Sequence, residues 1–330
     1  MNIQSIKYFK TYPFIICLLI CTINTACITP TKPVKHNLAY ITNQGDNTVS
    51  VIDTSINQVI KVIKVGKAPV GVAVSAQLQR AYISNVESQE ISIINTQNNT
   101  VIETLKIKGS PVGLALSSDS RKLYIADWFE NKVIAMNTLH TDDVNEVSVG
   151  DAPAGLAVSP DNQWLYVANR DSNDIAIIDT ATLTIKNRIQ VGEHPFGIFI
   201  SNSGKLLVSV NVKGDTVSII NLQSNAQQKI KVGYHPYCAA ISADGTTLYV
   251  TNTQDDSVSV INIASGKSIT TINIGSTPEG IGIDNANHRA YIANWGNNNV
   301  SVIDTINNKL LTTIKTGDKS RAFGQFILSQ

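Results

Sequence analysis

The sequence predicts an all-β fold: a single seven-bladed β-propeller whose blades are four-stranded antiparallel sheets. One pattern of about 42 residues recurs seven times between Leu38 and the last residue. A strand tyrosine marks six of the seven copies, and Val208 takes its place in the fifth; the tyrosines are Tyr40, Tyr82, Tyr124, Tyr166, Tyr249 and Tyr291. An Asn or Asp follows each of these seven positions three residues later. Repeats of roughly 40–50 residues made of short strands are typical of propellers, in which each repeat forms one blade.

The fourth repeat shows how one copy forms four strands. Alternating or β-branched runs occur at 155–159, 165–168, 175–178 and 185–191, and clusters of Asn, Asp, Pro and Gly separate them. Such runs and clusters are typical of strands and turns, respectively. No segment after residue 26 keeps a 3.6-residue period, so we expect no helix there.

The repeats are shifted relative to the blades. The propeller, residues 38–330, opens at Leu38 with a second strand, and Ala322 to Ser329 read as a first strand. We therefore expect the C-terminal segment to complete the blade begun at the N-terminus, as three strands plus one. This closure removes a free sheet edge that would otherwise template aggregation.

Residues 1–26 are predicted to be an export signal rather than part of the fold. Lys7 and Lys10 precede a mostly apolar run from Pro13 to Ile23, and the small residues Thr25 and Ala26 follow. A charged start, a short apolar core and a small-residue cleavage site define a secretory signal. The apolar run is shorter than a membrane-spanning helix requires.

Cys27 directly follows this segment and resembles the acylated cysteine of a bacterial lipoprotein. The resemblance departs from the pattern at Asn24, where Leu or a similar residue is usual, so simple cleavage and release is the alternative. Residues 27–37 then form a short tether. We expect an exported protein, periplasmic, attached to the outer membrane as a lipoprotein, or at the cell surface. Ile28 after the cysteine, in place of an inner-membrane retention Asp, favours the outer membrane in a Gram-negative cell.

Charge and cysteine content exclude two broad classes. The formal net charge is +1, and removing Lys7 and Lys10 with the signal leaves 24 basic against 25 acidic residues. A nearly neutral protein has no global attraction for nucleic acid. Of the four cysteines, only Cys238 lies within the predicted propeller, so it has no disulfide framework. We expect Cys238 to be a small buried residue and not a nucleophile.

Several segments resemble the YVTN repeat family of bacterial and archaeal surface propellers. They are Leu165 to Asn169, Leu248 to Asn252, Val300 to Thr305, the linker Gly66 to Gly71 (Gly-x-x-Pro-x-Gly) and the terminal Ala322 to Ile327. The resemblance covers about nine-tenths of the chain and implies an exported, often surface-attached propeller. Most members have no assigned chemistry. The wider group includes a single-stranded-DNA-binding periplasmic propeller, sugar-lactone hydrolases and the haem-d domain of a nitrite reductase.

Residues present in every repeat are interpreted as structural. The Asn or Asp after each second strand forms one such set: Asn43, Asn85, Asp127, Asn169, Asn211, Asn252 and Asn294. A second set follows each third strand: Asp53, Asn95, Asn137, Asp179, Asn221, Asn262 and Asp304. Short side-chain acceptors that cap their own turns explain both sets without a catalytic role.

Function is expected where the repeats differ. The linkers between blades and the loops between second and third strands should share one face at the end of the channel. Three consecutive linkers carry only small or aliphatic residues beside the proline, whereas the next four carry histidines, aromatic residues and charged residues. The predicted ligand- or partner-binding face comprises His194, Phe196, His235, Tyr237, Glu279 and Arg321 from the linkers, with Trp128, Arg170 and Trp295 from the loops. The structural alternative is that loop residues vary freely and that the closing blade is atypical, in which case these residues have no binding role.

The leading hypothesis is a non-enzymatic binding or scaffold propeller that recognises a protein or a small ligand on this face. The first alternative is an enzyme or redox accessory, with His194, His235 and Glu279 around a metal or haem. A second alternative, single-stranded-DNA binding, draws on the aromatics with Arg170, Lys213 and Arg321, although the composition disfavours nucleic acid. We predict no cofactor, no metal and no catalytic residue. The chain has no Gly-x-Ser-x-Gly elbow and no dinucleotide fingerprint.

Overall fold

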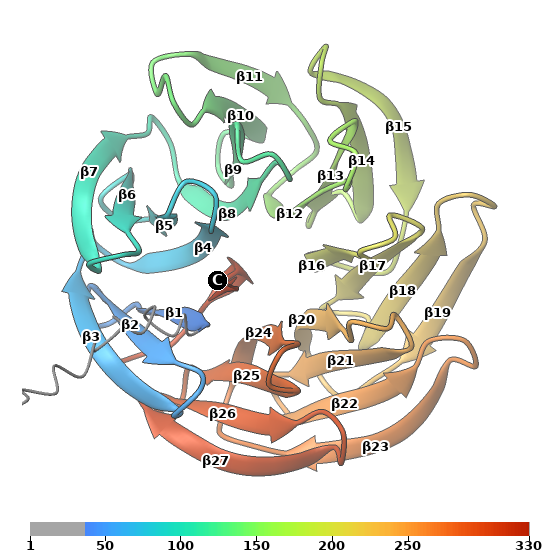
Figure 1. Ribbon diagram of the computed structural model, residues 1–330. Helices are drawn as coiled ribbons and strands as arrows, with labels where there is room; N and C mark the ends of the chain where they lie inside the picture. Colours follow the sequence, from blue (N-terminus) through green and yellow to red (C-terminus); the bar gives the residue numbers. More distant parts are fainter. Residues whose placement is uncertain (1–36, 330) are drawn as a thin grey trace, which may run out of the picture. The chain divides into compact units, whose positions relative to one another are not determined.

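The computed structural model describes residues 37–329, which form seven sheets arranged in a ring (Figure 1). The predicted signal segment 1–26 and all of the tether except Asn37 lie outside the described residues. Six sheets have four strands, and the seventh has a fifth strand added in the channel. The predicted propeller and its blade count are therefore confirmed. No helix occurs within the described part of the chain, and so none that could span a membrane.

The blades follow one another along the chain, apart from one closing sheet. That sheet, here called the seam blade, contains β1 (Leu38–Asn43), β2 (Thr48–Asp53), β3 (Gln58–Lys64) and β29 (Ile327–Leu328). The second blade contains β4 (Pro69–Ser75), β5 (Arg80–Asn85), β6 (Glu90–Asn95) and β7 (Thr100–Lys106). The third contains β8 (Pro111–Leu116), β9 (Lys122–Asp127), β10 (Lys132–Asn137) and β11 (Val144–Ser148).

Four further blades complete the ring. They are β12 (Pro153–Val158), β13 (Trp164–Asn169), β14 (Asp174–Asp179) and β15 (Thr184–Gln190); β16 (Pro195–Ile200), β17 (Leu206–Asn211), β18 (Thr216–Asn221) and β19 (Gln227–Lys231); β20 (Pro236–Ile241), β21 (Thr247–Asn252), β22 (Ser257–Asn262) and β23 (Lys267–Asn273); and β24 (Pro278–Asp284), β25 (Arg289–Asn294), β26 (Asn299–Asp304) and β27 (Lys309–Lys315). Within each blade the order runs from channel to rim. Second and third strands are buried nearly throughout because both sheet faces pack against neighbouring blades, whereas fourth strands are mostly exposed.

The C-terminal segment closes the ring at its centre (Figure 1). In β29, Leu328 pairs with Leu38, and the predicted seam of three strands plus one is confirmed. The expected single strand from Ala322 to Ser329 is, however, divided. Its first part, β28 (Phe323–Gln325), pairs in parallel with β4 of the second blade. Gly324 permits this approach, because it has φ +109° and a Cβ there would lie 2.5 Å from the Val72 carbonyl oxygen.

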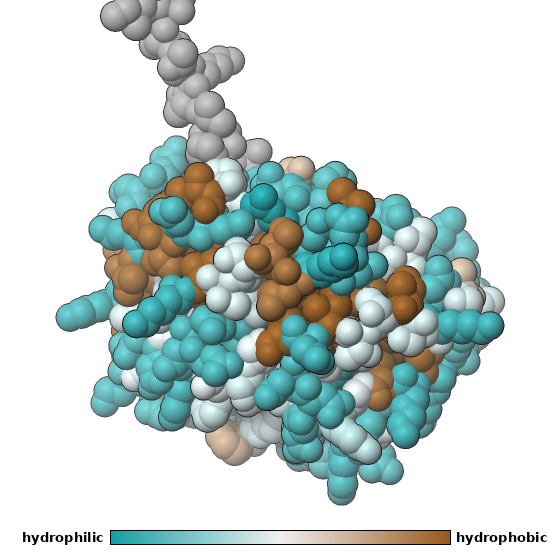
Figure 2. All heavy atoms as spheres, turned by 90° about the horizontal axis from the view of Figure 1, so that it is seen from below, coloured by the Kyte–Doolittle hydropathy of each residue, from teal (hydrophilic) through white to brown (hydrophobic). Residues whose placement is uncertain are grey.

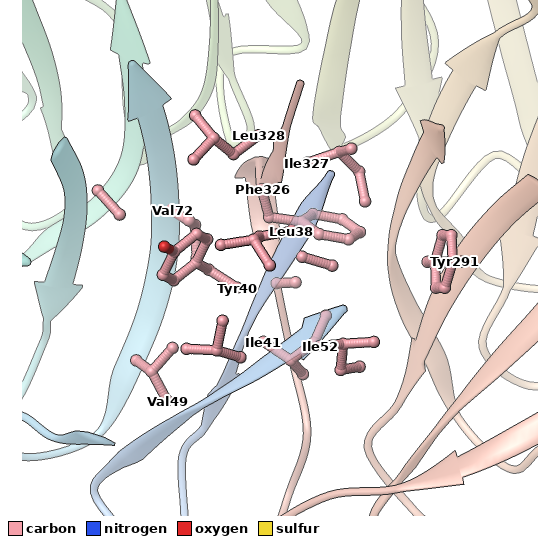
Figure 3. Close-up of a cluster of buried hydrophobic side chains, with 14 of the residues drawn as sticks. Leu38, Tyr40, Ile41, Val49, Ile52, Val72, Tyr291, Phe326, Ile327 and Leu328 are labelled. Atoms are coloured by element: carbon pink, nitrogen blue, oxygen red, sulfur yellow. The ribbon is translucent and has the colours of Figure 1, made fainter. Parts of the chain in front are cut away.

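A hydrophobic cluster holds the seam together (Figure 3). Phe326, Ile327 and Leu328 contribute to it from the C-terminal segment, and Leu38 and Tyr40 from β1. These side chains are at most 8% exposed. Burial of large apolar side chains is the main favourable term in folding, so this cluster joins the two ends of the propeller chain.

Both sets of recurring Asn and Asp residues are structural, but only the second set caps its own turns throughout as predicted. In the first set, Asn43 is fully buried; it donates hydrogen bonds to Thr48 and Ser50 and accepts one from the Gly317 N–H at 3.1 Å. Asp127, Asn169 and Asn211 also accept a linker N–H. The first set therefore ties four of the seven linkers to the loops beside them. In the second set, Asp304 caps its own turn to the fourth strand by accepting the Ile306 N–H.

Candidate functional site

The linkers and the loops between second and third strands lie together on one face. In every blade, the residue after the buried Asn or Asp donates its N–H to the carbonyl of the residue at the pre-proline position of a linker. The pairs are Gln44–Lys319, Val86–Ala68, Trp128–Ser110, Arg170–Ala152, Val212–His194, Thr253–His235 and Trp295–Thr277. We call this surface the linker face. Six of the nine residues predicted to bind a ligand or partner lie in these linkers and loops, and Phe196, Tyr237 and Glu279 are each the second residue of the strand that follows a linker.

The linker backbone is held in an uncommon conformation. His194 and His235 have φ of 53° and 54°, in the left-handed region that few non-glycine residues adopt. Asn173 accepts the His194 N–H, and Asp215 accepts the His235 N–H, each at 2.8 Å. Ala68, Ala152, Thr277 and Lys319 share this conformation at the same point of their linkers. The conformation is therefore a property of the repeat, and only the side chains differ from blade to blade.

Four aromatic rings close the channel beneath the linker face. The Phe196 ring lies 4.3 Å from that of Tyr237 and 4.8 Å from that of Phe323, between centroids. The Trp128 ring also packs against Phe196, with 5.8 Å between the centroids. Phe196 is only 7% exposed, so its ring is used in packing and is not a free stacking surface. Such aromatic contacts add about 0.5–1.5 kcal/mol per pair beyond area burial.

A buried ion pair lies beside these rings. Arg321 contacts both carboxylate oxygens of Glu279, through Nε to Oε2 and through Nη2 to Oε1 at 2.9 Å. Its Nη2 also donates to the Tyr237 hydroxyl at 2.9 Å. Burial raises the pKa of the Glu279 carboxyl, and the Arg321 guanidinium opposes this. The carboxylate, guanidinium and phenol thus satisfy one another, which leaves little free charge at the mouth of the channel.

Gln44 extends this network to the seam. Its Oε1 accepts the Trp295 indole N–H at 3.2 Å and a longer contact from Arg321 Nη1 at 3.4 Å. The ammonium group of Lys319 lies over the Trp295 ring, 5.3 Å from its centroid. We refer to Trp128, Phe196, Tyr237, Glu279, Arg321 and Phe323 as the mouth cluster.

The remaining predicted residues lie at the edge of the mouth cluster. Arg170 lies over the Trp128 ring, 5.6 Å from its centroid, and pairs with Asp171 at 2.6 Å. His235 Nδ1 is 3.0 Å from the Thr253 hydroxyl. Burial, reinforced by the charge of Arg170, lowers the pKa of His194, which favours its neutral form. Among residues 37–329 no three His, Cys, Asp or Glu side chains are grouped to hold a metal ion.

Cys238 has the buried position expected of it. It stands where other linkers have glycine, its N–H donates to Thr251, and it is 1% exposed. Burial, followed by the nearby Glu279 charge, raises the pKa of its thiol well above the usual range. A thiol held in its protonated form is a poor nucleophile.

Three residues of this face were not singled out by the sequence. Phe129 and Tyr234 are 75% and 60% exposed, respectively, the former directly after Trp128 and the latter directly before His235. Only their position in loops that were already candidates pointed to them. Phe323 was expected in a closing strand, and its place in the mouth cluster depends on the parallel pairing of β28 with β4, which no local pattern indicates.

The other end of the channel is open. A cavity of about 770 Å³ extends along the first strands to the turns between first and second strands. Aliphatic side chains from equivalent positions line it, including Leu116, Val158 and Ile200, and the C-terminal segment contributes Gln325. Of the mouth cluster, only Phe323 lines this cavity within the described chain.

Comparisons with known proteins agree on the fold. The family model described as lactonase, 7-bladed beta-propeller, matches residues 134–231. A functionally unknown protein from Desulfotomaculum acetoxidans aligns with a TM-score of 0.75 and 15% identity, covering 87% of this chain and 100% of its own. Hydrazine synthase of Kuenenia stuttgartiensis aligns with a TM-score of 0.74 and 19% identity, covering 81% and 92%.

A third solved structure, the dihydro-haem d1 dehydrogenase NirN in complex with DHE, has a TM-score of 0.66 and 16% identity and covers 87% of this chain and 66% of its own. No curated protein matches the sequence. At these identities the structures share a fold, and a fold of this kind hosts unrelated activities.

Proposed function

We propose that this protein is an exported, envelope-associated, non-enzymatic binding or scaffold propeller that recognises a protein partner on the linker face. One observation supports this most strongly. The side chains suited to chemistry, Glu279, Arg321 and Tyr237, bind one another, whereas the aromatic side chains at the edge of the same face remain exposed. Exposed aromatics beside a closed, shallow mouth favour a protein surface over a deeply bound ligand.

Two exposed aromatic side chains and two half-buried side chains of the face follow an arc over neighbouring blades. Phe129 comes from the third blade, Arg170 from the fourth, His194 from the linker to the fifth and Tyr234 from the linker to the sixth. Aromatic and arginine side chains are the residue types that most often dominate binding energy at interfaces. The linker backbone is fixed by the hydrogen bonds described above, so these side chains are presented on a rigid frame, which lowers the entropy cost of association.

A paired comparison tests this proposal. Envelope extract is passed over the immobilised protein, its Phe129→Ala/Tyr234→Ala variant and a Leu139→Ala control. Leu139 is 61% exposed and lies at the opposite end of the same blade as Phe129. We expect one stoichiometric protein to be retained by wild type and control and lost from the double variant. Equal retention by all three would refute the proposal.

The enzymatic alternative has its own observation, the lactonase model match over residues 134–231, which include His194 and Phe196. Lactone hydrolysis by the purified protein, or stoichiometric metal or a Soret band, with loss in His194→Ala, would favour it over binding. For the DNA alternative, Arg321 is already paired with Glu279 and Arg170 with Asp171. Retention of a single-stranded oligonucleotide that falls steeply with salt would support that alternative.

We further infer that the chain belongs with the YVTN-type propellers and is held at a membrane through acylated Cys27. Stable attachment requires more than one acyl chain, as bacterial lipoproteins carry. Cys27→Ser should shift the protein from the detergent-soluble membrane fraction to the soluble fraction. A wild-type protein that is already soluble, with an N-terminus near Ile28, would instead indicate simple cleavage and release.

A further inference from the structure

The outer rim of the propeller is not uniform. The large apolar side chains that are exposed on fourth strands belong mainly to four of them. They are Ile60 and Val62 in β3, Val101 and Ile102 in β7, Ile269 in β23, and Leu310 and Leu311 in β27. The fourth strands of the other three blades, β11, β15 and β19, expose one such side chain among the described residues, Val144.

These four strands are neighbours around the ring. Contacts connect β23 to β27, β27 to β3, and β3 to β7, so these strands follow one another along the rim over four of the seven blades. We call their exposed apolar side chains the apolar belt. In Figure 1 its strands occupy the lower and left part of the ring. Figure 2 views the propeller from below and shows hydrophobic side chains gathered in patches among polar ones on this side. Ile56 and Ile306, in the turns that precede β3 and β27, are exposed as well.

The belt is also positively charged. Its four strands contain one acidic residue, Glu103, and six lysines: Lys61, Lys64, Lys106, Lys267, Lys309 and Lys315. Lys106 pairs with Glu90, and the other five belt lysines form no ion pair with a described residue. The fourth strands β15 and β19 are basic as well, but they expose no large aliphatic side chain, so only the belt combines the two features. Lysines beside exposed aliphatic side chains suit a surface that is both apolar and anionic.

We propose that the centre of the apolar belt, formed by β27 and β3, is an interfacial surface that rests on an anionic lipid bilayer, with Ile60, Val62, Leu310 and Leu311 at the acyl boundary and the four lysines of these strands at the headgroups. Apolar area and attraction to anionic lipid together determine interfacial binding of this kind. The inference builds on the proposed envelope location but does not require Cys27 to be acylated, and it concerns a surface other than the linker face.

The point where the described chain begins agrees with this orientation. Asn37 is fixed to the seam blade and its neighbour, because its side chain donates to Asp284 at 2.7 Å and its carbonyl accepts from Thr54. The belt strand β3 lies in the same blade, two strand spacings, or about 10 Å, from β1. An extended chain from Cys27 to Asn37 reaches at most about 35 Å. A membrane anchor at Cys27 is therefore within covalent reach of the belt.

A site-specific label tests the proposal. In the full chain with Cys17, Cys21 and Cys27 replaced by serine, Val62→Cys or Val144→Cys carries an environment-sensitive fluorophore. Both positions are exposed valines on fourth strands, 56% and 44%, and only Val62 lies in the belt. With vesicles of phosphatidylglycerol and phosphatidylcholine we expect a blue shift at Val62→Cys, quenching there by lipids with brominated acyl chains, and neither effect at Val144→Cys. Quenching by brominated acyl chains reports insertion of the labelled side chain itself, which attachment of the N-terminal segment to the vesicle would not by itself produce.

The charge requirement is tested separately. Partitioning should weaken on pure phosphatidylcholine vesicles, and about fivefold for each of Lys61→Gln and Lys309→Gln. The Phe129→Ala/Tyr234→Ala variant should bind vesicles normally, so failure of the linker-face proposal would not be mistaken for failure of this one. Equal responses at both labels, or none at Val62→Cys, would overturn the proposal. So would a Val62→Cys shift that depends on protein concentration without vesicles, since it would assign the belt to a second copy of the chain.

Discussion

The two ends of the central channel are built from the same repeat, but one end is closed and the other is open. At the linker face, the mouth cluster closes the channel with side chains that differ from blade to blade. At the other end, equivalent aliphatic residues such as Leu116, Val158 and Ile200 surround an open cavity. The repeat by itself therefore builds an open channel. Closure comes from the departures from the repeat, and two of the decisive ones are Phe323, in the C-terminal segment, and Arg321, directly before it.

Removing that segment should have the largest effect, because it serves both ends. Phe323, Phe326, Ile327 and Leu328 are at most 8% exposed, and burial of each contributes about 1.5–3 kcal/mol. Their sum, on the order of 10 kcal/mol, equals the whole stability of a typical domain. We expect deletion of Ala322 to Gln330 to abolish cooperative thermal unfolding. Gln325→Ala, at an exposed position of the same segment, should melt like wild type. A truncated protein that melts normally and stays monodisperse would show that the seam does not close the ring.

Arg321→Ala should have the next largest effect and act on the closed end alone. It leaves Glu279 buried without its partner, and breaking a buried pair in this way typically costs about 3–5 kcal/mol. Chemical denaturation of the single variants and of Arg321→Ala/Glu279→Gln gives the coupling between the two residues. The double variant should recover part of the loss, because no charge is left unpaired.

The pH dependence of the stability of Arg321→Ala tests the same loss of the Glu279 partner. Burial raises the pKa of Glu279, so without Arg321 the folded state takes up a proton more readily than the unfolded state. Stability of the variant should therefore rise, relative to wild type, as the pH falls from about 7 toward the ordinary pKa of a glutamate. A deficit that stays constant over this range would mean that the pKa of Glu279 in the folded variant is no higher than in the unfolded chain.

Asp284→Asn tests the seam at the open end and should have an intermediate effect. Asp284 accepts hydrogen bonds from Asn37, Thr54 and Asn287, at 2.7, 2.6 and 2.7 Å, respectively. Burial alone would raise its pKa, but these hydrogen bonds outweigh burial and hold the pKa of Asp284 below its usual range. Its contribution, about 1–3 kcal/mol, is then present at neutral pH and lost as the pH falls through the lowered pKa. Wild type and variant should converge in acid; a gap that persists there would contradict this.

The smallest effect is expected for a thiol reagent added to the folded protein. Its reaction with Cys238 reports how tightly the closed end is packed. In the chain with Cys17, Cys21 and Cys27 replaced by serine, a thiol reagent should react with Cys238 only after unfolding, because the thiol is buried and its pKa is raised. Rapid reaction of the folded protein would show that the mouth cluster opens readily.

The sequence predicted the propeller well because the same pattern occurs in all seven repeats. Seven copies of the strand and turn pattern support one another. The periodicity of the recurring Asn and Asp residues indicated a structural role, but the bonds of the first set to the linkers were not predicted. The shared face of His194, Tyr237 and Trp295 followed from blade topology.

The contacts among the residues of the linker face did not follow from the blade topology. Whether Phe196 stacks on a ligand or on Phe323 depends on where a segment more than 120 positions away enters the channel. The division of the expected closing strand into β28 and β29 likewise depends on tertiary packing at Gly324. Phe129 and Tyr234 were missed for a related reason, since exposure of a loop side chain is decided by its neighbours in space.

The position of β28 and β29 also has a consequence for how the chain reaches its folded state during synthesis. A chain made from its N-terminus presents Asn43 long before Gly317, its hydrogen-bond partner 274 positions later. The seam blade must wait as three strands while six others assemble, with the surface of β1 uncovered and available to chaperones or to misfolding. Synthesis of the segment from Phe323 to Leu328 is therefore the step that commits the ring to closure.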